Sequence, residues 1–199
     1  MTPTTTQCRA TVPSPIGDLL LEGDDEALTH LYLPGRWPLD PLPGGAPPSR
    51  PLIDATAQLR EYFAGRRRSF DVAVRLEGTP FQRQVWSALA GIPYGETISY
   101  GELAARVERP RGFRAVGQAN GANPVAIVFP CHRVIAADGT IGGYGGGVDA
   151  KRTLLALERR RAKAGSPAPW RAQKGAGRQE AGTAPRIHSS PATSARRWS

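Results

Sequence analysis

The chain has 199 residues, 40% of them hydrophobic, and 26 lysines and arginines stand against 17 acidic residues, which gives a formal net charge of +9. Its longest apolar runs, such as Val125–Phe129, are far too short to cross a bilayer, and the polar N-terminus has no apolar stretch of a signal peptide, so we expect no membrane partner. The two cysteines, Cys8 and Cys131, exclude a disulfide framework and indicate a reducing, cytoplasmic location.

Residues 1–78 alternate short apolar runs with Gly/Pro-rich turns, which is typical of a small α+β domain with a sheet. A helix is predicted over 52–64, with Gly65 as its cap, after a Pro/Gly-rich loop at 34–51. No catalytic group of residues is visible in this part. The predicted strands are 18–22, 28–33 and 70–76.

Residues 79–161 predict a mostly helical domain. The pairs Thr79/Gln82 and Ser99/Glu102 are two capping boxes, and each opens a helix with an apolar face. Pro110 breaks the second helix, and a third runs from about Arg111 to Gln118 or Asn120. Two short helices joined by a tight turn have the outline of a helix-turn-helix, although many helical hairpins bind no DNA.

The remainder of this domain predicts a buried strand over Val125–Phe129, with Cys131 at its end. A glycine-rich turn at 141–147 holds Tyr144. A last helix, capped by Asp149, extends through Glu158.

The segment 162–199 is rich in Ala, Gly, Pro, Ser and Arg, lacks periodicity and carries seven basic residues against one acid. We predict a basic, disordered tail there. A basic surface attracts polyanions such as nucleic acid, but a solvated tail without a specific ligand remains open.

Cys131 is the candidate nucleophile. A cysteine attacks as a thiolate, so it needs a base or a positive field, and His132 and Arg133 follow it directly. Neighbours on a strand point to opposite faces, so contact with His132 requires a bend or a bridging water. Taken alone, such a Cys-His pair is more often structural. Glu158 is a candidate to orient the imidazole, which spacing alone does not establish.

The sequence around these residues resembles the O6-alkylguanine-DNA alkyltransferases. The resemblance is close over about 79–161 and looser toward the N-terminus, at Ser14-Pro15-Ile16-Gly17. The motifs that carry it are Ile98-Ser99-Tyr100, Arg114-Ala115-Val116-Gly117, Asn123-Pro124, Pro130-Cys131-His132-Arg133-Val134, Gly142-Gly143-Tyr144 and Leu154-Leu155-Ala156-Leu157-Glu158.

This resemblance implies a ribonuclease H-like N-terminal domain with an antiparallel sheet and a C-terminal domain with a helix-turn-helix. It implies DNA repair by irreversible, stoichiometric transfer of an alkyl group from O6-alkylguanine to Cys131, without a cofactor. The partner would be double-stranded DNA, bound through its minor groove by a monomer that flips the nucleotide out of the stack. Whether O4-alkylthymine is also a substrate stays open.

The resemblance also assigns roles in the reaction. Cys131 would accept the alkyl group, His132 would take its proton through a water, and Glu158 would hold His132. Asn123 would brace the turn before the active site, and the Tyr100 hydroxyl would support the leaving guanine. Without the resemblance, Tyr100 reads as a packed aromatic, Asn123 as a turn residue and Glu158 as a solvated helix residue.

On the DNA side, Arg114 would fill the gap left by the extruded nucleotide, while small residues of the same helix, such as Ala115 and Gly117, would let it lie in the minor groove. Without the resemblance, Arg114 reads as a surface charge. The substrate pocket would be walled by Val134, Tyr144, Gly145 and Gly146.

Two features depart from the family pattern. The pocket turn reads Tyr144-Gly145-Gly146 where the family often has Tyr-Ser-Gly, and we hypothesise that Gly145 makes the pocket more permissive toward larger alkyl groups. Some relatives bind zinc near the N-terminus, but Cys8 and His30 alone are too few for a closed site, so we expect no metal.

Three other functions compete with alkyl transfer. A non-enzymatic damage sensor would lack the acceptor cysteine. A helix-turn-helix regulator would need a sensor domain, and residues 1–78 show no metal-binding cysteine cluster. A Cys-His hydrolase would release its product and react repeatedly, whereas an alkyltransferase of this kind reacts once.

Overall fold

The computed structural model describes residues 7–38, 47–164 and 186–188 of the chain. Its sheet has the strand order β1-β2-β3-β4-β7. The first three strands pair antiparallel, which confirms the predicted N-terminal antiparallel sheet, and the last two add in parallel. The strands are β1 (Cys8–Val12), β2 (Leu19–Gly23), β3 (Leu28–Tyr32), β4 (Ala73–Arg75) and β7 (Arg186–His188).

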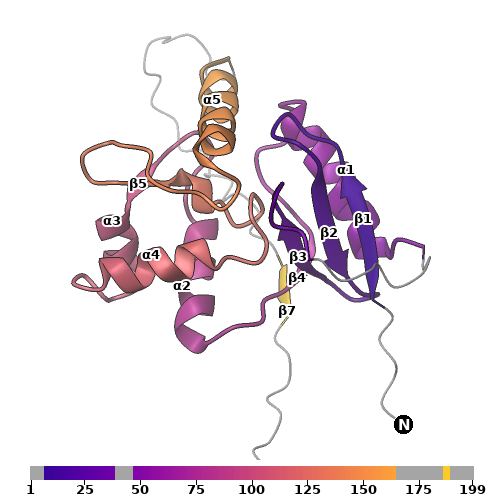
Figure 1. Cartoon of the computed structure of the whole chain (residues 1–199), viewed down its shortest axis with the longest axis horizontal. Coiled ribbons are helices and arrows are strands. Elements are labelled where there is room, and N and C mark those ends of the chain that lie inside the picture. The colour runs from indigo at the N-terminus through magenta and orange to yellow at the C-terminus, as the bar shows by residue number, and fades with distance from the viewer. Residues whose placement is uncertain (1–6, 39–46, 165–185, 189–199) are drawn as a thin grey trace, which may run out of the picture.

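The helix α1 (Arg50–Phe63) covers one face of this sheet (Figure 1). It begins with Pro51 in its first turn, where the missing N–H costs no helical hydrogen bond. Its apolar stripe, with Leu52, Leu59 and Tyr62 fully buried, packs on the strands. The chain leaves the helix through Gly65, whose positive φ of 74° suits a residue without a side chain.

The second half of the chain is mostly helical, as predicted, and lies on the β3–β4 side of the sheet (Figure 1). Both predicted capping boxes are present, at Thr79/Gln82 and at Ser99/Glu102. The helices α3 (Tyr100–Arg106) and α4 (Phe113–Gly121) form the predicted helix-turn-helix outline. The elements are α2 (Pro80–Ala90), β5 (Ile98–Ser99), α3 (Tyr100–Arg106), α4 (Phe113–Gly121), η1 (Cys131–Arg133), β6 (Val134–Ile135) and α5 (Val148–Ala164).

The predicted strand at Val125–Phe129 is wrong. These residues are buried, but they form an irregular turn in which Ile127 has a positive φ of 73° and the Phe129 N–H donates to the Val125 carbonyl at 3.0 Å. An apolar run reports burial, and it does not distinguish a strand from a buried turn. Cys131 consequently lies in the short 3₁₀ helix η1 rather than at the end of a strand.

Other expected boundaries differ too. The strand β1 was not predicted, and α5 begins at Val148, so Asp149 lies in its first turn instead of capping it. The predicted disordered tail, 162–199, falls mostly outside the described residues. The structure describes only two parts of this segment, the last residues of α5 and the strand β7. The composition of the segment predicted neither of them.

The two halves share one hydrophobic core. Its buried members come from the sheet, α1, the C-terminal helices and the turn before η1. The Leu31 N–H of β3 donates to the Pro124 carbonyl at 2.8 Å, which ties the sheet to that turn. Among the described residues, no helix has the length and apolar character that crossing a membrane requires.

Candidate active site

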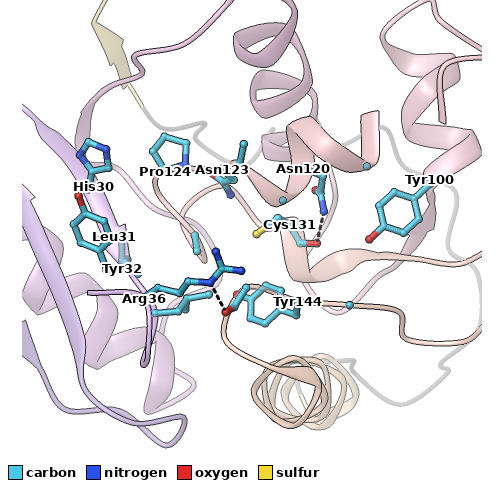
Figure 2. Close-up of a pocket in the computed structure, with 17 residues that line it drawn as sticks. His30, Leu31, Tyr32, Arg36, Tyr100, Asn120, Asn123, Pro124, Cys131 and Tyr144 are labelled. Atoms are coloured by element: carbon cyan, nitrogen blue, oxygen red, sulfur yellow. Dashed lines mark hydrogen bonds between the residues drawn. The ribbon is translucent and has the colours of Figure 1, made fainter. Parts of the chain in front are cut away.

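A cavity of about 600 Å³ lies between the two halves of the molecule, and Cys131 lines it (Figure 2). The N-terminal half contributes residues of β3 and the segment after it. The C-terminal half contributes α3, α4, the turn before η1 and the glycine-rich turn. The labelled lining residues in Figure 2 are His30, Leu31, Tyr32, Arg36, Tyr100, Asn120, Asn123, Pro124, Cys131 and Tyr144.

Two asparagines at the end of α4 hold the backbone around the cysteine. Asn123 Nδ2 donates to the Phe129 carbonyl at 2.7 Å, while its Oδ1 accepts from the Val125 N–H at 3.1 Å. Asn120 Nδ2 lies 3.4 Å from the Cys131 carbonyl oxygen. Asn123 therefore contacts both ends of the turn that precedes η1. The contact of Asn120 was not predicted.

The sulfur of Cys131 is largely withdrawn from water, because the residue is only 5% exposed. Burial raises the pKa of the Cys131 thiol, and Asn123 and the positive charge of Lys151 offset part of that rise. The cysteine therefore rests as a thiol and needs a base to remove its proton.

His132 supplies a candidate base. Its Nε2 lies 2.9 Å from Oε1 of Glu158, and both side chains are fully buried. A carboxylate partner assigns the proton to Nε2, which leaves Nδ1 as the acceptor nitrogen. Among the described residues Nδ1 has no hydrogen-bond partner. Burial lowers the pKa of His132 despite the nearby Glu158, so the imidazole is neutral and able to accept a proton.

Four residues contact the Glu158 carboxylate through hydrogen bonds, one in α1, one in the loop after α2 and two in η1. Burial would raise its pKa, but His132 and Arg133 lower it well below the usual value, so it is a carboxylate. Apart from His132, the hydrogen-bond partners of Glu158 were not predicted from the sequence. These donors are Tyr62 Oη at 2.7 Å, the Gly95 N–H at 3.0 Å, and Arg133 through Nε and a terminal nitrogen, each at 2.9 Å.

Lys151 was also missed. It is fully buried in α5, and its Nζ donates to the carbonyls of Val134 at 2.7 Å and Ile141 at 2.6 Å and lies 3.4 Å from that of Gly143. Burial lowers the pKa of Lys151. The ammonium thus fixes the start of the glycine-rich turn. No pattern in the sequence distinguishes it from a solvated helix lysine.

The predicted pocket residues divide into two groups. Tyr144 and Gly145 line the cavity together with Tyr100 and Cys131. Burial, and then the proximity of Cys131, raise the pKa of the Tyr100 hydroxyl, which keeps it a hydrogen-bond donor. Val134 is fully buried in β6, and Gly146 faces Leu33; neither belongs to the described lining of this cavity.

Of the predicted DNA-contacting residues, Arg114, Ala115 and Gly117 lie on α4, and Tyr100 begins α3. Arg114 and Ala115 are exposed, and the Arg114 guanidinium lies 5.9 Å from the ring centre of Phe113, which is itself 52% exposed. Gly117 faces Tyr100, and a Cβ at that position would lie 3.8 Å from the phenol ring. The helix therefore presents a solvent-facing surface on one side and part of the cavity wall on the other. Within the described part of the chain, no group of three or more His, Cys, Asp or Glu side chains could hold a metal ion.

Comparison with known proteins gives a consistent picture. The profile for the 6-O-methylguanine DNA methyltransferase DNA binding domain matches residues 80–160, and that for the ribonuclease-like domain matches residues 8–76. A methylated-DNA–protein-cysteine methyltransferase of Mycolicibacterium paratuberculosis is 53% identical over 77% of this chain and 93% of its own length. The chain belongs to this methyltransferase family.

Further members of the methylated-DNA–protein-cysteine methyltransferase family agree. One from Methanosarcina acetivorans is 47% identical over 73% of this chain and 94% of its own length. A crystal structure of Mycobacterium tuberculosis OGT in complex with DNA has a TM-score of 0.70 and 49% identity over 76% of this chain and 92% of that chain. These matches confirm the α+β fold and the family inferred from the motifs around Cys131.

Proposed function

We propose that this protein repairs DNA by moving the alkyl group of O6-alkylguanine onto Sγ of its own Cys131. The observation that carries the proposal is the buried Cys131-His132-Glu158 arrangement at the cavity. His132 follows Cys131 directly, its Nε2 contacts Glu158, and its Nδ1 has no partner among the described residues. The relatives named methylated-DNA–protein-cysteine methyltransferase support the same activity.

The reaction follows from the charge states at the site. The Cys131 thiol gives its proton to Nδ1 of His132, through a water, and Glu158 stabilises the imidazolium that forms. The sulfur attacks the alkyl carbon as the bond from that carbon to O6 breaks, and the bonding electrons stay with the purine. The Tyr100 hydroxyl donates a hydrogen bond to the purine as this charge develops. The thioether product is not hydrolysed, so each molecule reacts once.

The guanine has to leave the stack to reach a cavity between the two halves. We infer that α4 lies in the minor groove, that Arg114 fills the space left in the duplex, and that Ala115 and Gly117 allow close approach. The mycobacterial OGT solved with DNA supports a DNA-binding surface on this fold. We further propose that the protein acts as a monomer in the cytoplasm without a cofactor. Val134 and Gly146 would support the pocket wall from behind.

Intact-protein mass after mixing with an oligonucleotide that carries one O6-methylguanine tests the proposal. We expect a gain of one methylene that stops at one equivalent and is absent in Cys131→Ser. The matched control is Cys8→Ala, which removes the other buried cysteine and should still gain the methylene. An unchanged mass together with lesion-selective binding would favour a damage sensor, and release of free product with repeated turnover would favour a hydrolase.

A further inference from the structure

One permanent charge lines the cavity. Of the described residues that form its wall, Arg36 alone carries a charge that does not titrate near neutral pH, and none is an aspartate or a glutamate. Arg36 comes from the segment that follows β3 in the N-terminal half, whereas Cys131 comes from the C-terminal half. Figure 2 shows the Arg36 guanidinium reaching into the cavity on the same side as the Cys131 sulfur.

A backbone turn and one side-chain hydrogen bond hold the exposed Arg36 at the cavity. The Arg36 N–H closes a turn on the Leu33 carbonyl at 3.1 Å, and Gly35, with a positive φ of 76°, allows that turn. The side chain donates from Nε to the Gly145 carbonyl at 3.0 Å. Its two terminal NH₂ groups donate to none of the described residues, so they remain available to a ligand.

We propose that Arg36 is a specificity-determining residue, which makes the pocket favour O6-alkyl groups that carry a carboxylate over neutral groups of the same size. This inference rests on the proposed function. A guanidinium fork matches the two oxygens of a carboxylate and binds them with charge-assisted hydrogen bonds. No acidic side chain of the described lining opposes the bound charge.

Space beside the guanidinium supports this selectivity. A Cβ built on Gly145 would lie 4.0 Å from Nε of Arg36 and 3.7 Å from Leu33, so the bare glycine leaves room next to the cation. A substituent on the transferred carbon could occupy that room. Arg36 would touch this substituent and none of the atoms that react.

For a carboxymethyl group, the bonds, electrons and protons of the transfer step balance. The Cys131 sulfur bonds to the methylene carbon, the bond from that carbon to O6 breaks, and its electron pair stays on the purine. The thiol proton moves to His132, and the guanine takes up a proton in return. The product is S-carboxymethyl Cys131, with its carboxylate still paired to Arg36.

The test compares two oligonucleotides, one with O6-carboxymethylguanine and one with O6-carbamoylmethylguanine, which is neutral and nearly the same size. We expect the ratio of their transfer rates to fall about tenfold in Arg36→Gln, because one close charge pair is lost. Arg36→Lys should restore part of the ratio, since it keeps the charge without the fork. Arg50→Gln is the matched control, because Arg50 is an exposed α1 arginine paired with Asp54.

Other outcomes separate the two proposals. If Arg36→Gln slows both adducts equally, Arg36 contacts DNA phosphates or only supports the fold, and the inference is overturned. An unchanged ratio overturns it as well, while transfer from O6-methylguanine still upholds the proposed function. If the wild-type protein takes no alkyl group from any of the three adducts, the proposed function itself fails.

Discussion

The Tyr62 hydroxyl donates a hydrogen bond of 2.7 Å to Oε1 of Glu158, and the two residues lie 96 positions apart in the chain. The same oxygen lies 2.9 Å from Nε2 of His132. Tyr62 belongs to α1 and Glu158 to α5, so a helix of the N-terminal half holds the carboxylate that orients the candidate base.

Replacing Tyr62 by phenylalanine should therefore affect both stability and reaction. We expect Tyr62→Phe to lower the free energy of unfolding by about 1.5–3 kcal/mol, the usual range for a hydrogen bond to a charged group. Alkyl transfer should slow, but less than in Glu158→Gln. Urea unfolding and single-turnover rates measure both effects. Tyr94→Phe is the control, because the buried Tyr94 hydroxyl has no partner among the described residues; an equal loss in both variants contradicts the prediction.

The transfer rate should be nearly independent of pH at least from about pH 6.5 to about pH 8.5, the ordinary pKa values of histidine and cysteine. Burial raises the pKa of Cys131 and lowers that of His132, so between the two values the protein keeps a thiol beside a neutral imidazole. Once the pH falls below the lowered pKa of His132, the imidazole takes up a proton and the rate falls. Quenched single-turnover reactions with O6-methylguanine oligonucleotides measure the profile. A tenfold rise per pH unit within the range would instead show that only the free thiolate attacks.

Lys151→Met should loosen the glycine-rich turn. The ammonium donates to the carbonyls of Val134 and Ile141, and the substitution leaves both without it. We expect a loss of about 3 kcal/mol in unfolding free energy and slower transfer, because an unsatisfied buried group costs about 1–3 kcal/mol. Hydrogen exchange at 141–147 and urea unfolding are the measurements. The neighbouring Arg152→Met, which is 62% exposed at its side chain, should change little, and similar exchange in the two variants would refute the role of Lys151.

Gly145→Ser should narrow the pocket. A Cβ there would meet only ordinary contacts with Leu33 and Arg36, so the variant is expected to fold, yet its side chain would take up space in the cavity wall. We expect the rate for benzyl adducts to fall relative to methyl adducts. Competition between the two oligonucleotides gives the ratio directly, and a ratio equal to that of the wild type removes Gly145 as the cause of a permissive pocket.

Local signals in the sequence predicted much of this fold. Thr79 accepts a hydrogen bond from the Gln82 N–H at 3.2 Å, and Ser99 accepts from the Glu102 N–H at 3.1 Å, as their capping boxes predicted. These contacts span three residues, so the sequence alone contains both partners. The contact between His132 and Glu158 spans 26 residues and was expected only because the motifs resemble a family.

The residues that sequence reasoning missed depend on long-range packing. Tyr62 reads as one more apolar position of α1, and its hydroxyl finds Glu158 only once the two halves share a core. Lys151 looks like an ordinary surface cation, because most lysines and arginines are solvated. Arg36 is indeed exposed, and only its hydrogen bond to the Gly145 carbonyl shows that it belongs to the cavity wall. Val125–Phe129 was misread because burial, not strand pairing, explains its composition.

A protein that reacts only once must reach damaged DNA with its sulfur intact. Peroxides and disulfides react with cysteines that are ionised and accessible to solvent. Cys131 is only 5% exposed, and its raised pKa keeps it protonated. We therefore expect the burial that makes the thiol depend on His132 also to slow its reaction with oxidants. Slow oxidation and dependence on a neighbouring base would then be two results of one packing arrangement.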